Sequence, residues 1–392
     1  MSNKKSHSSA HSGSIRKRSD GRWEARYTVG FDPKTGKQIQ KSIYGKTQNA
    51  VRQKLTSIVA EIDSGTYIEP SKMTLNQWLD IWLADYLINL KPSTAFLYER
   101  VAATYIRPSL GEKRLDVLSA HEVQHLYNDM LNGRGFNKAL SAKTVKDVHG
   151  ILHRCLNQAL QMNYIKHNPT SACVLPRKAN KKIMPMTDEQ LNDFLQRVKG
   201  DKYELEYIVF LFTGMRESEL LGLMWDCVNF ENGTILVDKQ LVKDRRKGGT
   251  YYFSEPKNGK SRIITPAPYV MKILRLQKNK QNILRMQAGQ AWEESGLVFT
   301  NELGRYVSYR AIYDSYKKVV TEMGAPHLRL HDLRHTYAVN SIRAGDDIKT
   351  VQENLGHATA AFTLDVYAHF TDDMKQASAA RMEQFIVENV CI

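Results

Sequence analysis

The chain has 392 residues, more than one hydrophobic core usually serves, so two or three domains are expected. Its formal net charge of +15 at pH 7 favours a polyanion as its partner. The sequence has no run of about eighteen apolar residues and no apolar signal core near its start, which predicts a soluble cytoplasmic protein and not a membrane protein. The four cysteines lack CxxC spacing, which argues against a zinc site and against a disulfide framework.

The first part of the chain predicts a tail followed by a small β-sheet domain. Residues 1–13 are polar and cannot bury a core, so we expect them to be disordered. Residues 14–66 combine period-two alternation with turn signals, which indicates an antiparallel sheet and a following helix. The expected elements are strands around 13–17, 22–29 and 38–44 and a helix over 47–63.

This predicted sheet is strongly basic. The first 54 residues hold 13 lysines and arginines against three acidic residues. A small antiparallel sheet with one basic face fits the major groove of DNA, and Arg16, Arg18 and Arg26 are the candidate contacts. The alternative is a half-buried sheet whose cations only face water.

Residues 73–175 predict an all-helical domain of four helices. Apolar residues recur at helical spacing, and the aromatic stripe that starts with Trp78 and Trp82 is expected in the shared core. The second helix is expected to be capped by Ser93–Thr94 and to end before Pro108.

Three lysines of this domain lie at predicted loops or helix starts, where they can meet DNA phosphates: Lys91, Lys143 and Lys146. Exposed lysines are common, so plain solvation is the alternative for each of them. Residues 176–184 are polar and basic, which fits an exposed linker that follows a phosphate backbone.

Residues 185–392 predict a mixed, mainly helical domain with a small antiparallel sheet. A capping box at Thr187–Gln190 opens one helix, and an apolar helix ends near Gly214. Arg216 then lies at a helix junction, where Glu219 is expected to orient it, because an arginine among apolar residues needs a partner. Short strands are expected over 233–237, 250–253, 262–265 and 297–299.

The second and third of these strands are predicted to pair as a hairpin across Asn258–Gly259, since Asn-Gly is a strong hairpin signal. A lysine at such a turn, Lys257 or Lys260, can swing into a closing active site. Downstream, His331 and Arg334 form an HxxR motif on one face of a predicted helix.

The next predicted helix ends in Leu355-Gly356-His357, and Tyr367 follows His357 by ten residues. These residue types suit phosphoryl transfer. Arginine forks bind the non-bridging oxygens of a phosphodiester, and a tyrosine hydroxyl can attack phosphorus and hold the phosphate covalently. A lysine or histidine can protonate the leaving sugar oxygen, so neither a metal nor a nucleotide cofactor is required.

The segment around Arg216, the HxxR motif, the LGH motif and Tyr367 together resemble the tyrosine recombinases, above all the integrases of phages and conjugative transposons. The likeness covers roughly residues 180–375. It implies an enzyme that integrates and excises a mobile element through a 3′-phosphotyrosyl intermediate. The catalytic set it implies is Arg216, Lys257, His331, Arg334, His357 and the nucleophile Tyr367.

The resemblance also implies the division of labour among domains and the partners. The β-sheet domain would bind arm-type DNA sites, and the two following domains would clasp the core-type site. An apolar stripe over residues 374–390 would form a terminal helix that links four protomers on DNA. An excision factor and a host DNA-bending protein are further candidate partners.

Two other classes of protein stay open at this point. A type IB topoisomerase would share the active-site chemistry but would need no arm-binding domain. A DNA-binding regulator without chemistry would bind specific sites and leave no covalent adduct.

Overall fold

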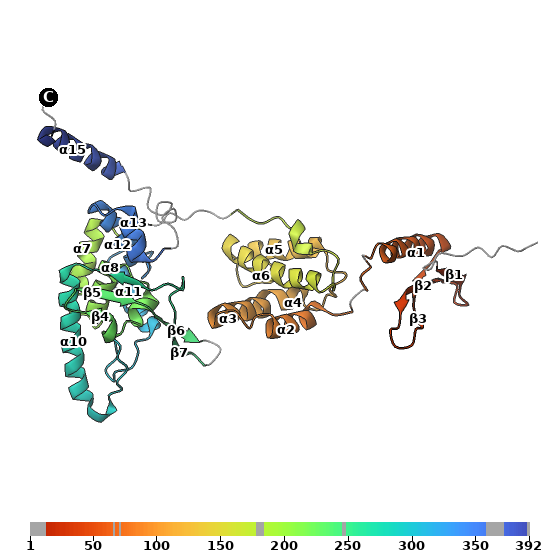
Figure 1. The fold of residues 1–392 in the computed structure, drawn as a ribbon, viewed down its shortest axis with the longest axis horizontal. Coiled ribbons are helices and arrows are strands. Elements are labelled where there is room, and N and C mark those ends of the chain that lie inside the picture. The colour runs from red at the N-terminus through yellow and green to blue at the C-terminus, as the bar shows by residue number, and fades with distance from the viewer. Residues whose placement is uncertain are drawn as a thin grey trace, which may run out of the picture. The chain divides into compact units, whose positions relative to one another are not determined.

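The structure, a computed structural model, describes residues 13–65, 67–69, 72–177, 184–244, 248–357 and 372–389, and only the backbone of 372–378. The chain divides into two compact units, Met1–Ala179 and Asn180–Ile392. Figure 1 labels the helices and strands of both. The expected disordered tail and Tyr367 lie outside the described residues, as does most of the predicted linker. Within the described part, every helix is too short or too polar to cross a bilayer.

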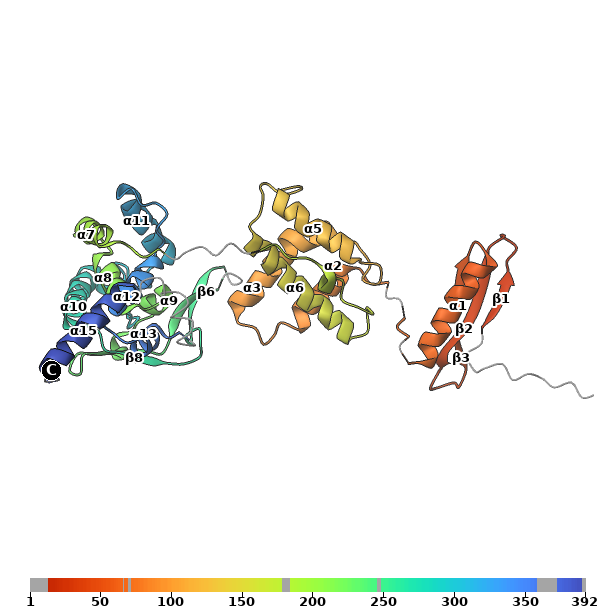
Figure 2. The ribbon, with the colours of Figure 1, turned by 90° about the horizontal axis from the view of Figure 1, so that it is seen from above.

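The first unit begins with the antiparallel sheet and helix that the alternation predicts. Strands β1 (Ser14–Lys17), β2 (Trp23–Phe31) and β3 (Gln38–Gly45) pair in the order β1-β2-β3, and α1 (Gln48–Asp63) follows. Figure 2 shows α1 along one face of this sheet. Because side chains alternate along a strand, Ala25 and Tyr27 pack with Val51 and Leu55 of α1, and Glu24 lies on the opposite face.

The helical part of this unit follows. It consists of α2 (Leu75–Asp85), α3 (Pro92–Val101), a π-helical turn (Ala102–Ile106), α4 (Arg107–Leu110), α5 (Ala120–Asn132) and α6 (Ala142–Gln161). Trp78 and Trp82 are buried in its core as expected, and the Trp78 indole N–H donates to the Cys155 carbonyl at 3.0 Å. Burial of both indoles on one face of α2 fixes how that helix packs.

The expected start and end of the second helix are wrong. The N-cap is Lys91, with Pro92 as the first helical residue, where the missing proline N–H costs nothing. The chain then passes through the π-helical turn and continues into α4, which contains Pro108. A π-helical turn changes the hydrogen-bond register, so it accommodates a proline that would break a regular α-helix.

The second unit is mainly helical with two small sheets. Its helices are α7 (Asp188–Arg197), α8 (Glu204–Thr213), α9 (Glu217–Leu221), α10 (Pro268–Ala288), α11 (Tyr309–Glu322), α12 (Asp332–Arg343), α13 (Ile348–Leu355) and α15 (Asp372–Asn389). The predicted capping box of α7 is present. Helix α8 is buried almost throughout and packs against α10 and α12, so it forms the centre of this core.

The strands of this unit are β4 (Val228–Asn229), β5 (Thr234–Val237), β6 (Gln240–Asp244), β7 (Thr250–Ser254) and β8 (Arg262–Ile264). They form one sheet in the order β4-β5-β8 and a separate β6-β7 pair. The expected strand over 297–299 is absent from the described structure, where Leu297 makes only an isolated bridge with Met224.

The predicted hairpin between the strands that flank Asn258–Gly259 is also wrong. Strand β7 pairs with β6, and β8 pairs with β5. The Asn-Gly turn is present, with Gly259 at φ +66° and its N–H bonded to the Pro256 carbonyl at 2.8 Å. However, residues 255–261 separate the two strands, and a turn fixes strand pairing only when the strands flank it directly.

Candidate active site

Arg334 of the HxxR motif is buried between the ends of two helices. Its side chain rises from the first turns of α12, and the residue is only 2% exposed. Nη1 donates to the Gly214 carbonyl and Nη2 to the Leu355 carbonyl, both at 2.7 Å. These carbonyls lie at the C-termini of α8 and α13, where the helix dipole favours a cation.

Gly214 is required where it stands. It ends α8 with φ +62°, and a Cβ there would lie 2.3 Å from the Tyr337 ring. The close approach of these two segments brings Arg216, two residues on, to the same place as Arg334.

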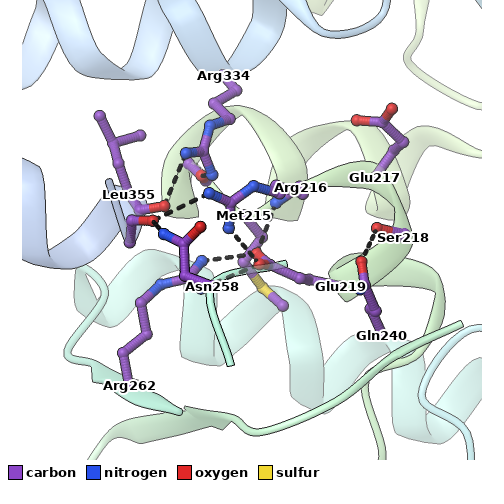
Figure 3. Close-up of polar contacts among 12 residues, drawn as sticks. Met215, Arg216, Glu217, Ser218, Glu219, Gln240, Asn258, Arg262, Arg334 and Leu355 are labelled. Carbon is purple, nitrogen blue, oxygen red and sulfur yellow. Dashed lines mark hydrogen bonds and ion pairs between the residues drawn. The ribbon is translucent and has the colours of Figure 1, made fainter. Parts of the chain in front are cut away.

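Arg216 is the N-cap of α9 and lies beside Arg334 (Figure 3). Its backbone N–H donates to Glu219 Oε2 at 2.8 Å and its Nη1 to Glu219 Oε1 at 2.7 Å. Its Nη2 donates to the Gly356 carbonyl at 2.9 Å. The contact with Glu219 that the sequence leads us to expect is therefore present, and the two arginines bond to the consecutive carbonyls of Leu355 and Gly356.

Glu219 is fully buried between two guanidinium groups. Besides Arg216, it accepts from Arg262 Nη2 at 2.6 Å and from Arg262 Nη1 at 3.1 Å. Burial raises the pKa of Glu219, but the hydrogen bonds and charge of Arg262 and the charge of Arg216 outweigh it and hold the pKa at about 2. The carboxylate is therefore ionised at neutral pH and orients both guanidinium groups.

Sequence reasoning missed Arg262. It lies at the start of β8, and its Nε also donates to the Asn354 carbonyl at 2.8 Å. One signal was available in the sequence. Arg262 stands next to the apolar residues Ile263 and Ile264, and a charge beside a strand that packs into a core needs a partner. Nothing local identifies Glu219, 43 residues earlier, as that partner.

His331 is the N-cap of α12, one turn before Arg334, and its Nδ1 lies 3.1 Å from Glu217 Oε2. Burial raises the pKa of Glu217, but the hydrogen bond and charge of His331 outweigh it and the pKa is lowered. An ionised carboxylate only accepts, so His331 Nδ1 donates this hydrogen bond and Nε2 takes no part in it. Glu217 is a second residue that the sequence did not indicate, because its contact spans 114 residues.

Two further histidines belong to this part of the structure: His335, which follows Arg334 in the sequence, and His357 of the LGH motif. The His335 ring stands edge-on to the His331 ring at 5.1 Å between centroids, and burial, followed by the charge of His331, lowers the pKa of His335 to about 4. His357 follows Gly356, which ends α13 with φ +64°. Burial and then the charges of Arg334 and Arg216 lower the pKa of His357 to about 3, so His357 is neutral at pH 7.

The candidate general acid lies on the exposed turn between β7 and β8. Lys257 and its rival Lys260 are both exposed there. Between them, the Asn258 side-chain Nδ2 donates to the Gly356 carbonyl at 2.8 Å (Figure 3). This contact brings the turn to the same carbonyl that receives Arg216.

The candidate DNA contacts of the N-terminal sheet form a cluster within the first unit. On the sheet face away from α1, Glu24 is buried and accepts from Arg16 Nε at 2.7 Å and Arg26 Nε at 3.3 Å, while Arg18 Nη1 lies 3.9 Å away. The hydrogen bond from Arg16 is the main cause that lowers the pKa of Glu24 to about 2. The arginines selected from the sequence thus form one cluster around a carboxylate.

The lysine candidates of the helical domain differ in their surroundings. Lys91 is exposed at the N-cap of α3, and Lys146 is half-buried on α6. Lys143 is exposed and forms an ion pair with Asp147 at 2.6 Å. An exposed pair of this kind holds its lysine only weakly.

Two family models match the chain. The model "Phage integrase family" matches residues 181–374, and "Phage integrase, N-terminal SAM-like domain" matches residues 74–131. The chain belongs to the phage integrase family. It is a tyrosine-type site-specific recombinase, as its motifs predict.

Relatives and solved structures agree with this assignment. The recombinase is 28% identical over 378 residues to a "Tyrosine recombinase XerC-like" protein of Caldanaerobacter subterraneus subsp. tengcongensis, covering 92% of this chain and 95% of the relative. It matches the integrase of transposon Tn1549, solved with a circular intermediate DNA, with a TM-score of 0.66 and 24% identity over 79% of this chain and 100% of that chain.

A lambda integrase tetramer bound to a Holliday junction matches with a TM-score of 0.53 and 17% identity over 88% of this chain and 96% of that chain. These likenesses confirm the predicted fold class, a multidomain α+β protein with a small N-terminal sheet, a helical domain and a mainly helical catalytic domain.

Proposed function

We propose that this recombinase integrates and excises a mobile element by cutting and rejoining DNA through a 3′-phosphotyrosyl intermediate on Tyr367. The observation that carries this proposal is the convergence of two guanidinium groups on adjacent carbonyls. Arg334 bonds to Leu355 and Arg216 to Gly356, immediately before His357. Two planar forks held side by side suit the two non-bridging oxygens of one phosphodiester.

In the proposed cleavage step, the Tyr367 Oη–P bond forms as the P–O5′ bond breaks. The phenol proton is proposed to pass to Nε2 of His331, whose ring is oriented by the contact between its Nδ1 and Glu217. Lys257 gives a proton to the leaving 5′-oxygen, and His357, neutral at pH 7, donates a hydrogen bond to a non-bridging oxygen.

Rejoining is the reverse reaction with the 5′-hydroxyl of a partner strand. The phosphotyrosyl bond keeps the energy of the broken diester, so exchange requires no ATP and no metal.

The proposed DNA partners follow the domains. The arginine cluster around Glu24 is proposed to read arm-type sites, with Arg16, Arg18 and Arg26 as its cations. The helical domain is proposed to meet the core-type site through Lys91, Lys143 and Lys146. Lys91 and Lys143 are exposed, which supports phosphate contacts, whereas Lys146 is half-buried. We expect affinity for both site types to fall with salt, because lysines and arginines replace condensed counterions.

We also propose a homotetramer on DNA that is linked by α15. Three apolar side chains of α15 are more than half exposed: Met382, Phe385 and Val387. Met382 and Phe385 lie three residues apart on one face of this helix, and their role as a protomer contact is supported by the tetrameric form of the lambda relative. An excision factor and a host DNA-bending protein remain proposed partners.

The test uses a nicked suicide duplex that carries the element's own end sequence. We expect a covalent protein–DNA band with the wild type and none with Tyr367→Phe. Tyr269→Phe is the matched control, since Tyr269 is an exposed tyrosine of the same unit, and it should give the wild-type band.

Tight binding by the wild type without any adduct would replace the proposal by a DNA-binding regulator. Relaxation of supercoiled DNA without sequence preference would instead identify a type IB topoisomerase.

A further inference from the structure

The turn that carries Lys257 is held against the LGH segment by one side chain. Asn258 Nδ2 donates to the Gly356 carbonyl at 2.8 Å across 98 residues of sequence. Asn258 is exposed, so opening this bond leaves no buried amide without a partner, because water can replace the carbonyl. The bond therefore adds little to the folding of the core, and its main effect is on where the turn lies.

The acceptor of this bond is also bonded to the phosphate-binding group. The Gly356 carbonyl receives Arg216 Nη2 at 2.9 Å, and its two lone pairs allow both donors at once. Lys257, the neighbour of Asn258, is thus placed relative to the guanidinium that would hold the scissile phosphate.

A second contact fixes the other end of the turn. Arg262, four residues after Asn258, donates to the Asn354 carbonyl at 2.8 Å and forms a bidentate pair with Glu219. Arg262 is mostly buried and Asn258 is exposed. Of the two contacts, the one made by Asn258 is therefore the one that can open without disturbing the core.

We propose that Asn258 is a positioning residue that docks the Lys257 turn at the active site. This inference rests on the proposed function, in which the Lys257 ammonium protonates the 5′-oxygen as the P–O5′ bond breaks. With the Asn258 bond made, the lysine is held beside the phosphate. With the bond broken, the turn is tethered only at its ends, and the fraction of molecules with the lysine in place falls.

Substrates with different leaving groups distinguish this positioning role from a purely structural one. In a substrate with sulfur at the bridging 5′ position, the P–S bond breaks to give a thiolate, which leaves without a proton. A variant that has lost only proton delivery is then rescued. A variant that has lost phosphate binding or has a distorted site is equally slow on both substrates.

The experiment measures covalent-adduct rates for the full chain on suicide duplexes with bridging oxygen or bridging sulfur. On the oxygen substrate, we expect Asn258→Ala to be slower by about fivefold to tenfold, the value of one hydrogen bond. Lys257→Ala should be slower by about a hundredfold or more, as for loss of a general acid. Both variants should approach the wild-type rate on sulfur.

Ser261→Ala is the matched control, because Ser261 is an exposed residue of the same turn, and it should match the wild type on both substrates. An Asn258→Ala rate equal to wild type on oxygen, or an equal loss on oxygen and sulfur, would overturn the positioning role. Failure of sulfur to rescue Lys257→Ala would instead show that the proposed general acid is wrong. A wild type without adduct would refute the proposed function itself.

Discussion

Glu219 offers the sharpest test of the electrostatics of this site. Its carboxylate is fully buried and lies between Arg216 and Arg262. Replacing it by glutamine keeps the shape but removes the charge, and turns an N–H₂ group toward a guanidinium that also only donates. Glu219→Gln should therefore leave two mostly buried cations without their anion.

The loss of stability expected for Glu219→Gln follows from the lowered pKa of Glu219. Glu219 ionises at about 2 in the folded protein against an ordinary value of 4.5, a difference that corresponds to about 3 kcal/mol of stability at neutral pH. Breaking a buried ion pair by removing one partner typically costs about 3–5 kcal/mol, which agrees.

The pH dependence has a definite sign. Because the folded-state pKa is depressed, the contribution of Glu219 is present in full above pH 4.5 and is lost as the pH falls toward 2. The stability difference between wild type and Glu219→Gln should therefore shrink by about 2 kcal/mol between pH 7 and pH 3.

Hydrogen exchange of the full chain in increasing urea, followed on peptides from α8 and α12, measures this free energy within the second unit. The control is Glu293→Gln, which breaks an arginine pair in which Glu293 is 58% exposed and should cost at most about 1 kcal/mol. A loss of unfolding free energy in Glu219→Gln as small as that of the control would refute this account of the site. So would a loss at pH 3 equal to the loss at pH 7.

Two further results are expected. Glu24→Gln should raise the affinity for random duplex DNA about threefold, since one charge several ångströms from a phosphate is worth about 0.5–1 kcal/mol. It should also reduce the preference for arm sites, measured by filter binding. An unchanged preference would argue against a role of the arginine cluster in arm-site recognition. Gly356→Ala, with φ +64° and a Cβ 3.0 Å from Arg262 Nη1, should lose about 1–2 kcal/mol and most cleavage activity. Gly324→Ala, with φ +70° in open space, should show the strain but keep its adduct yield.

Local signals in the sequence predicted local structure well. The capping box at Thr187 and the glycines that end α8 and α13 act within one helical turn, so their residues alone indicate where helices begin and end. The motif arginines also come together as expected, because the family resemblance carries their spatial relation as well as their spacing.

Contacts between distant segments were not predictable in the same way. The Asn-Gly signal located a turn correctly but gave the wrong partner for β7, because pairing with β6 is decided by the rest of the unit. Similarly, the sequence around His331 and the sequence around Glu217 give no indication that these two residues are in contact. The continuation of a helix through Pro108 depended on a π-helical turn, which residue preferences do not indicate.

Because the two motif arginines bond to successive carbonyls at the end of α13, the geometry of the site depends on the length of that helix. One residue inserted into or deleted from that helix would rotate the carbonyls of Leu355 and Gly356 by about 100° relative to its start, because an α-helix has 3.6 residues per turn. Both guanidinium groups and the lysine turn would then lose their acceptors together. Related enzymes and engineered variants should therefore tolerate length changes in surface loops such as the one between α5 and α6, and keep the length of α13 constant.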